Sequence, residues 1–193
     1  MTLSPSTLTA SPGGAEGLCL FETAIGHCAI AWGPAGIRGV QLPEADEAAT
    51  RRRMRARFPG VPESTPPDPV REAIARIVGL LEGAEDDLRS IVLDMADIAE
   101  FPRRVYELLR LLPPGRTSTY GEIAARLGAP GASRAVGRAL GDNPFAPVVP
   151  CHRVLASGGR PGGFSAAGGA TTKLRMLEIE RARFGRQPGL FER

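Results

Sequence analysis

The sequence predicts a small α/β domain followed by a mainly α-helical domain that contains a helix-turn-helix. Short apolar segments separated by Gly- and Pro-containing turns fill residues 18–42, a pattern typical of an antiparallel meander. Apolar residues at helical spacing follow as far as residue 81. Two short helical segments flank a Gly-containing turn within residues 119–141. We therefore expect domains over residues 17–96 and 97–193, each large enough to bury a core.

The composition is that of an ordinary soluble globular protein, with 42% hydrophobic and 23% charged residues. We find neither a secretion signal nor an apolar stretch long enough to cross a membrane. The three cysteines, at positions 19, 28 and 151, are odd in number and do not make a disulfide framework. We therefore expect a cytoplasmic location, because a reducing compartment suits a free reactive thiol.

The net charge of +3 hides an asymmetry between the two halves of the chain. Residues 1–100 carry 9 Arg and 15 acidic residues, a net charge of −6, whereas residues 101–193 carry 14 Arg, one Lys and 6 acidic residues, a net charge of +9. Such a split predicts that the second half faces a polyanion, with nucleic acid as the leading partner. A solvated arginine-rich surface is the alternative interpretation.

The first half of the chain predicts a tail and a small mixed domain. Residues 1–16 are rich in Ser, Thr, Pro and Gly without apolar periodicity, so we expect a disordered tail. The RRRMRAR run is expected to form an exposed basic helix face, and an apolar stripe marks a second helix. The predicted elements are strands over 18–23, 27–32, 37–42 and 88–93, and helices over 45–58 and 70–81, the latter with Ile74, Ile77, Val78 and Leu81 on its stripe.

The adjacent residues His27 and Cys28 are the metal-ligand candidates of this half. Only Cys19 lies near them, and no Cys-x-x-Cys or His-x-x-x-His spacing completes a tetrahedral site. We therefore expect no metal ion.

The second half predicts four helices. Phe101 begins the first, whose apolar stripe is Val105, Leu108, Leu109 and Leu112, and residues 113–115 (Pro-Pro-Gly) end it. Thr119 and Glu122 fit a capping box that opens the second helix, which runs to about residue 127. The third covers residues 133–141 and the last residues 172–183. Ile123, Ala124 and Leu127 are expected to face Val136 and Leu140 in a helix-turn-helix.

The helix over residues 133–141 is composed of small residues apart from Arg134 and Arg138. Its backbone can therefore approach a nucleic-acid groove closely, while it lacks the long polar side chains that read base edges. This pattern favours recognition of the shape and backbone of DNA. A phosphate contact or a surface ion pair is the alternative role for Arg134.

Cys151 and His152 form the strongest candidate for chemistry. Only a thiolate attacks, and a free cysteine titrates near ~8.5, so a reactive one needs a basic or cationic neighbourhood. His152 and Arg153 offer both kinds of group. Because neighbouring side chains of a strand point to opposite faces, His152 can assist Cys151 only through a turned backbone or a bridging water. The alternative is that Cys151 is a small buried hydrophobic residue.

The PCHRV motif, preceded by RAVGRALGDNP and followed by GGFS and KLRMLEIE, resembles the O6-alkylguanine-DNA alkyltransferases, also called methylated-DNA–protein-cysteine methyltransferases. The resemblance is close over residues 97–182 and vaguer upstream. It implies a ribonuclease-H-like N-terminal domain and a nucleoid-associated monomer that acts on double-stranded DNA without a cofactor. The implied reaction is a single, suicide transfer of an alkyl group from O6 of a flipped-out guanine to Cys151, and transfer from O4 of thymine stays open.

The resemblance also implies roles for individual residues. Glu180 orients His152, which takes the Cys151 proton through a water, and Glu178 is the competing carboxylate. Asn143 is a hinge between the DNA-binding helix and the active-site loop. Tyr120 turns the phosphate beside the target and assists protonation of the leaving base. Arg134 fills the gap in the base stack, and the remaining DNA-binding residues are Ser133, Ala135, Gly137 and Arg138.

The implied base pocket is formed by Pro150, Val154, Phe164 and Ser165. Main-chain carbonyls of Cys151 and Val154 are expected to accept from the guanine amino group, and Ser165 to donate toward O6. Position 164 is often tyrosine in relatives, so Phe164 keeps a wall but loses a hydroxyl. The loop between it and Lys173 is also longer than in some relatives.

Three other functions are compatible with parts of the pattern. A non-catalytic sensor of alkylated DNA would bind the lesion, but such relatives lack the reactive cysteine. A helix-turn-helix regulator would need base-reading side chains and usually a dimer. A cysteine hydrolase would leave Cys151 free after turnover.

Overall fold

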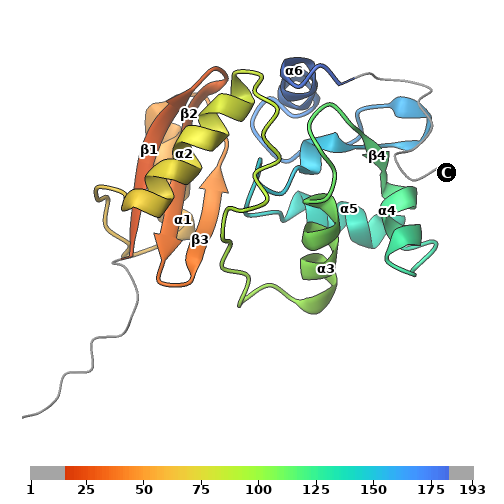
Figure 1. Ribbon diagram of the computed structural model, residues 1–193, viewed down its shortest axis with the longest axis horizontal. Helices are drawn as coiled ribbons and strands as arrows, with labels where there is room; N and C mark the ends of the chain where they lie inside the picture. The colour runs from red at the N-terminus through yellow and green to blue at the C-terminus, as the bar shows by residue number, and fades with distance from the viewer. Residues whose placement is uncertain (1–15, 183–193) are drawn as a thin grey trace, which may run out of the picture.

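The computed structural model describes residues 16–182, and its N-terminal half is built on a three-stranded antiparallel sheet (Figure 1). Strands β1 (Gly17–Thr23), β2 (Gly26–Gly33) and β3 (Gly36–Gln41) lie in the order β1-β2-β3. Both connections are tight turns that end on glycines with positive φ, 123° at Gly26 and 131° at Gly36. The predicted meander is therefore confirmed. The predicted tail lies outside the described residues, apart from Glu16.

Helices α1 (Glu47–Arg57) and α2 (Asp68–Leu81) cover opposite faces of this sheet. Successive side chains of a strand point to opposite sides, so β2 supplies both faces. Its Ala29 and Ala31 pack with Met54 of α1, while Ile30 joins the cluster that contains Ile77 of α2. The sheet is thus buried on both sides, and α1 starts at a capping Asp46 whose carboxylate accepts from the amide of Ala49.

The strand predicted over residues 88–93 does not form. Leu88 adopts a positive φ of 55°, and its amide donates to the Asp86 carboxylate 2.9 Å away, which turns the chain. The segment reaches the sheet only at an isolated bridge between Ile37 and Leu93. The segment was predicted as a strand because it is apolar. Its buried residues instead pack in the core without forming the backbone pairing of a strand.

The C-terminal half is mainly helical (Figure 1). The capping box of Thr119 and Glu122 is confirmed, with both reciprocal hydrogen bonds present. Two short strands, parallel to each other, tie the start of α4 to the segment after Cys151. The elements are α3 (Glu100–Leu109), β4 (Ser118–Thr119), α4 (Tyr120–Arg126), α5 (Ser133–Gly141), the 3₁₀ turn η1 (Cys151–Arg153), β5 (Val154–Leu155), the 3₁₀ turn η2 (Ser157–Gly159) and α6 (Ala170–Ile179).

Helices α4 and α5 pack against each other and against α3, as their apolar pattern predicts. Ile123 and Val136 are fully buried at this contact. Tyr106 of α3, which the predicted stripe omitted, is buried and donates its hydroxyl to the Ala139 carbonyl at 2.7 Å. Its ring also meets Phe145 edge-on, with centroids 6.3 Å apart. α5 is therefore anchored from behind by α3.

The last helix is shorter than predicted. α6 ends at Ile179, Glu180 occupies its C-terminal cap, and Arg181 adopts a positive φ of 55°. This turn ends the helix, and Ala182 after it is buried. Arg183 lies outside the described residues. Within residues 16–182, no helix is long and apolar enough to cross a membrane.

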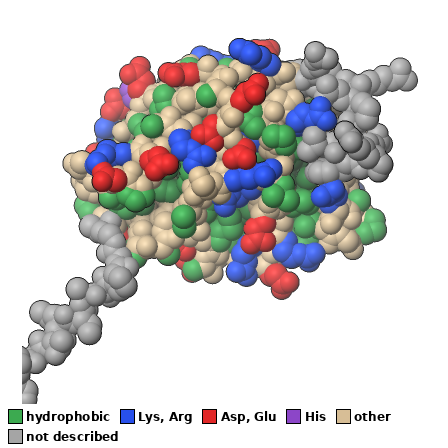
Figure 2. All heavy atoms as spheres, viewed as in Figure 1, with side chains coloured by type: hydrophobic (Ala, Val, Ile, Leu, Met, Phe, Trp, Pro, Cys, Tyr) green, Lys and Arg blue, Asp and Glu red, His purple; other side chains and the backbone are tan. Residues whose placement is uncertain are grey.

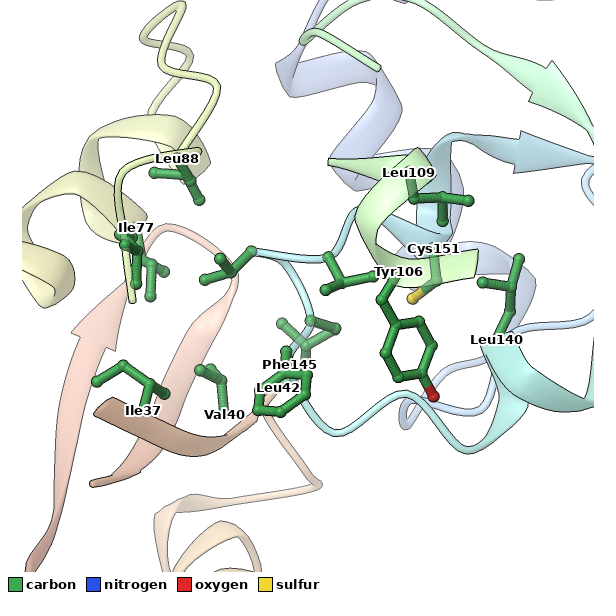
Figure 3. Close-up of a cluster of buried hydrophobic side chains, with 14 of the residues drawn as sticks. Ile37, Val40, Leu42, Ile77, Leu88, Tyr106, Leu109, Leu140, Phe145 and Cys151 are labelled. Carbon is green, nitrogen blue, oxygen red and sulfur yellow. The ribbon is translucent and has the colours of Figure 1, made fainter. Parts of the chain in front are cut away.

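One hydrophobic cluster spans both halves of the chain (Figure 3). It runs from α2 and β3 through Val40, Leu42 and Phe145 to Tyr106 and Cys151. A main-chain hydrogen bond reinforces the junction, because the Val40 amide donates to the Pro144 carbonyl at 2.8 Å. The edge strand β3 therefore abuts the loop that leads to Cys151.

The predicted basic face of α1 is largely neutralised. Figure 2 shows basic and acidic side chains interspersed over the face of the molecule that it draws. On α1, Arg51 pairs with Glu47 at 2.7 Å and Arg55 pairs with Glu63 at 3.3 Å. Arg57 is not fully exposed and donates to the Pro144 carbonyl at 3.3 Å. The RRRMRAR run was expected to be wholly exposed, and this arginine corrects that expectation because it crosses to the second half.

Candidate active site

Cys151 occupies a 3₁₀ turn, so the backbone is turned as the sequence argument requires. Pro150 precedes the turn with a φ of −81°, and the Cys151 amide donates to the Val149 carbonyl at 2.8 Å. The thiol lies in the core with 5% of the residue exposed. The other two cysteines lie on β1 and β2, where burial raises the pKa of Cys19 to about 11 and of Cys28 to about 12.

Glu180 lies buried between the two side chains that follow the cysteine. Its carboxylate is 2.8 Å from Nε2 of His152 and accepts two hydrogen bonds from Arg153, at 2.7 and 2.9 Å. The side chains of Glu180, His152 and Arg153 are exposed by 3%, 0% and 2% respectively. A fourth bond runs from the Gly115 amide to Glu180 at 3.3 Å. The competing carboxylate, Glu178, is exposed on α6.

These contacts fix the ionisation of the pair. Burial alone would raise the pKa of Glu180, but the His152 ring and the Arg153 guanidinium outweigh it and hold that pKa at about 2. Burial lowers the pKa of His152 despite the carboxylate, so the neutral imidazole is favoured. An ionised Glu180 can only accept, so Nε2 of His152 carries the proton. The Nδ1 atom is then a buried acceptor, and among residues 16–182 it has no hydrogen-bond partner.

The Cys151 thiol is kept protonated at rest. Burial raises its pKa, while the Asn143 amide and the charge of Lys173 act in the opposite direction. Arg153 was expected to supply the positive charge, and the structure corrects this, because its guanidinium is bound to Glu180 and to the Leu112 carbonyl. The nearby cation is Lys173.

Lys173 is fully buried on α6 and faces the site. Its Nζ donates to the Val154 carbonyl at 2.5 Å and to the Gly163 carbonyl at 3.5 Å. It also lies 5.9 Å from the ring centroid of Tyr120 and 6.0 Å from that of Phe164. Burial lowers the pKa of Lys173 to about 8. Lys173 was not among the predicted site residues, although it is the single lysine of the chain.

Asn143 links the end of α5 to the loop before Cys151. Its side-chain amide donates to the Val149 carbonyl at 2.9 Å, and its carbonyl oxygen accepts from the Phe145 amide at 3.0 Å. The side chain thus bridges two turns of the connecting segment. It therefore ties the end of α5 to the main chain two residues before Cys151.

The residues expected to touch DNA lie on one helix and at the start of another. Arg134 and Arg138 are exposed on α5, and among residues 16–182 neither side chain has a hydrogen bond or an ion pair. Ser133, Ala135 and Gly137 are only half-buried on the same helix. Tyr120 begins α4, is half-buried beside Gly137, and donates its hydroxyl to the Gly163 carbonyl at 3.4 Å.

Two cavities adjoin Cys151. One, of about 300 Å³, is lined by α5 residues, Tyr120, Phe164 and Ser165. The other, of about 270 Å³, lies between the second half and the N-terminal half and is lined by Asn143, Phe164, Ser165 and two arginines of α1. Pro150 and Val154, which were predicted to line the base pocket, are buried and line neither cavity. The arginines of α1 were not anticipated.

Replacing Glu180 by Gln is expected to lower the free energy of unfolding by about 3–5 kcal/mol at pH 7, because the Arg153 guanidinium stays buried without its carboxylate. The folded-state pKa of Glu180 is depressed from 4.5 to about 2, so its contribution is complete above pH 4.5 and disappears as pH falls toward 2. Urea unfolding of both proteins from pH 7 to pH 2 measures this. Glu178→Gln is the exposed control on the same helix, and equal effects of the two substitutions would contradict the assignment.

Residues 100–182 match the protein family described as 6-O-methylguanine DNA methyltransferase, DNA binding domain. A methylated-DNA–protein-cysteine methyltransferase from Methanothermobacter thermautotrophicus is 36% identical over 151 residues, which cover 78% of this chain and 77% of that protein. A protein of the same name from Mycobacterium bovis is 40% identical over 124 residues, 59% of this chain and 73% of that protein.

Solved structures give the same result. The crystal structure of Mycobacterium tuberculosis OGT in complex with DNA is 30% identical, with a TM-score of 0.68 over 85% of this chain and 92% of that chain. The O6-methylguanine-DNA methyltransferase from Pyrococcus kodakaraensis is 28% identical, with a TM-score of 0.64 over 86% and 98% of the two chains. With the identity to the M. thermautotrophicus relative extending over three quarters of that protein, the chain belongs to the methylated-DNA–protein-cysteine methyltransferase family.

Proposed function

We propose that the protein repairs DNA by transferring the alkyl group from O6 of guanine in double-stranded DNA to Cys151. One observation carries the assignment to this residue. His152 follows Cys151 in the same turn. Glu180 holds Nε2 of His152 at 2.8 Å, and the buried Nδ1 atom is an acceptor without a hydrogen-bond partner among residues 16–182. Such an arrangement can remove a proton from a protonated thiol.

The base must leave the duplex before it can reach the buried thiol, at a cost of a few kcal/mol. Arg134 is proposed to occupy the gap in the base stack, since it is exposed and uncommitted on α5. Ser133, Ala135, Gly137 and Arg138 complete the DNA-facing surface of the helix, whose small residues permit close approach. Tyr120 would turn the adjoining phosphate and assist protonation of the leaving base.

The groups of the site account for every bond and proton in the transfer step. His152, through a water at Nδ1, takes the proton of the Cys151 thiol, and the sulfur forms a bond to the alkyl carbon. The bond from that carbon to O6 breaks, its electron pair stays on guanine, and the proton ends on the base. The product is a thioether, which no group in the site can cleave, so each molecule acts once.

The base pocket is proposed to be the cavity of about 300 Å³ beside α5. Ser165, exposed at its rim, would donate toward O6, while the carbonyls of Cys151 and Val154 accept from the amino group. The Val154 carbonyl already accepts from Lys173, but a carbonyl oxygen has a second lone pair. Phe164 would provide one wall, held near Lys173, so its missing hydroxyl does not open the pocket.

The fold type of each domain, the location of the protein and its oligomeric state are part of the same proposal. The pair α4 and α5 would act as a helix-turn-helix, and the sheet with α1 and α2 as a ribonuclease-H-like domain over residues 17–96. The second domain would extend over residues 97–193. The protein would act in the cytoplasm, at the nucleoid, as a monomer without a metal or other cofactor. Transfer from O4 of thymine remains open.

Replacing Cys151 by Ala is expected to abolish transfer from a duplex that contains labelled O6-methylguanine, while binding of that duplex changes little. The thiol is the acceptor in the proposal, whereas α5 supplies most of the contacts to DNA. Label retained on the protein and duplex affinity measure the two effects separately. Loss of both to the same extent would mean that the cysteine is structural.

Replacing Arg134 by Ala is expected to slow transfer from duplex DNA by about tenfold or more, because the unstacked state loses the side chain that supports it. Transfer from the free base O6-benzylguanine, which needs no flipping, should be nearly unchanged. Single-turnover rates with the two substrates give the comparison. Matched losses on both substrates would contradict the intercalating role.

The same assays separate the alternatives. A sensor of alkylated DNA would bind the lesion duplex and remain unmodified. A transcriptional regulator would prefer one undamaged sequence over others, and a cysteine hydrolase would show repeated turnover with Cys151 recovered free.

A further inference from the structure

The cavity of about 270 Å³ also adjoins Cys151 but has a different lining. The two cavities share Gly141, Cys151, Phe164 and Ser165, but Tyr120 and Gly137 line only the one beside α5. Val40 and Leu42 of the N-terminal half line only the cavity of about 270 Å³. A base bound beside α5 therefore has, at the shared Cys151, a second space that the N-terminal half helps to enclose.

The second cavity has a polar, cationic wall. Arg53 and Arg57 of α1 line it, and Asp142 is the one carboxylate among the residues that do so. Arg53 is neutralised by Glu44 at 3.2 Å, and Asp142 is exposed to solvent. Arg57 has no ion pair among residues 16–182 and donates only to neutral oxygens of Val40, Gln41 and Pro144.

The guanidinium of Arg57 keeps capacity for a further partner. It has five N–H donors, and three hydrogen bonds at 3.2–3.3 Å use only its Nη1 and Nη2 atoms. Burial and the nearby charge of Arg53 lower its pKa, so the cation lacks a compensating anion where it lies. A methyl group transferred from O6 is uncharged and cannot pair with this cation. An anionic group on the lesion would supply the missing negative charge beside Arg57.

We propose that this cavity receives the alkyl group of the lesion and that Arg57, assisted by Arg53, selects O6 adducts that end in a carboxylate, such as O6-carboxymethylguanine. The proposal rests on the proposed alkyl transfer to Cys151. In the reaction the sulfur bonds to the methylene carbon, the bond from that carbon to O6 breaks, and the thiol proton passes to the guanine. The product is S-carboxymethylcysteine, whose carboxylate stays beside the two arginines.

Arg57 also holds the Pro144 carbonyl, one residue from Asn143, so its loss can slow every transfer. The test therefore uses a ratio of rates in which such a general loss cancels. The two probes are duplexes with O6-carboxymethylguanine and with O6-carbamoylmethylguanine, which is nearly the same in shape and is uncharged. A duplex with O6-methylguanine reports the basic reaction.

Arg57→Met is expected to lower the carboxymethyl to carbamoylmethyl rate ratio at least about tenfold, the factor equivalent to ~1.4 kcal/mol. Arg57→Lys should retain most of the ratio, because the charge remains. Arg53→Gln should lower it in the same direction, since one of the two arginine charges that line the cavity is then lost; this exposed position also provides a test if Arg57→Met fails to fold. Salt should reduce the wild-type ratio.

The matched control is Arg55→Gln, an exposed arginine of the same helix that pairs with Glu63 and does not line the cavity. Its ratio should equal that of the wild type. If both Arg57→Met and Arg53→Gln still transfer methyl groups and keep the wild-type carboxymethyl to carbamoylmethyl rate ratio, the proposal is overturned. Absence of transfer from all three duplexes would instead refute the alkyl transfer on which it rests.

Discussion

A buried carboxylate on the last helix, Glu180, holds both side chains that follow Cys151. Its side chain is 3% exposed and contacts His152 on one side and Arg153 on the other. Removing either partner would leave a charge or a polar ring in the core without compensation, which proteins rarely tolerate. Because Arg153 also donates to the Leu112 carbonyl and the Gly115 amide donates to Glu180, the contact joins α6, the turn after α3 and the active-site turn. The orientation of His152, and with it the chemistry of Cys151, depends on this junction.

The rest of the molecule determines what reaches that site. Asn143 connects α5 to the loop before Cys151, and the Val40 amide and the Arg57 guanidinium, both from the N-terminal half, contact Pro144 next to it. The active-site loop is therefore held from two sides, by α5, the helix proposed to face DNA, and by the small α/β half. This explains why a domain without a catalytic constellation of its own packs against the reactive one, and why its arginines reach the second cavity.

Local signals in the sequence predicted most of the fold. The meander, the capping box at Thr119 and the bounds of α5 follow from turn residues, a side-chain cap and apolar period, all of which act over a few residues. The pairing of His152 with Glu180 was expected from the family resemblance alone, since residues 28 positions apart carry no local signal of contact. The strand predicted near Leu88 failed because apolar composition does not reveal an Asp side chain that turns the backbone.

Two residues escaped the sequence analysis for a different reason. Arg57 belongs to a run of arginines of which Arg51, Arg53 and Arg55 are ion-paired, and only tertiary packing distinguishes it. Lys173 did carry a signal, because it is the single lysine in a chain that uses arginine at every other basic position. A compact ammonium fits a buried site beside a thiol, and its pKa falls there more readily than that of arginine.

The most direct test of the account is the mass of the intact protein and of its peptides after mixing with an excess of duplex DNA that contains O6-methylguanine. The account predicts a single methyl group per molecule, located on the peptide with Cys151 and absent from those with Cys19 and Cys28, which line neither of the two cavities beside Cys151. An unmodified protein that still binds the duplex tightly, or continued turnover with Cys151 unmodified, would contradict it.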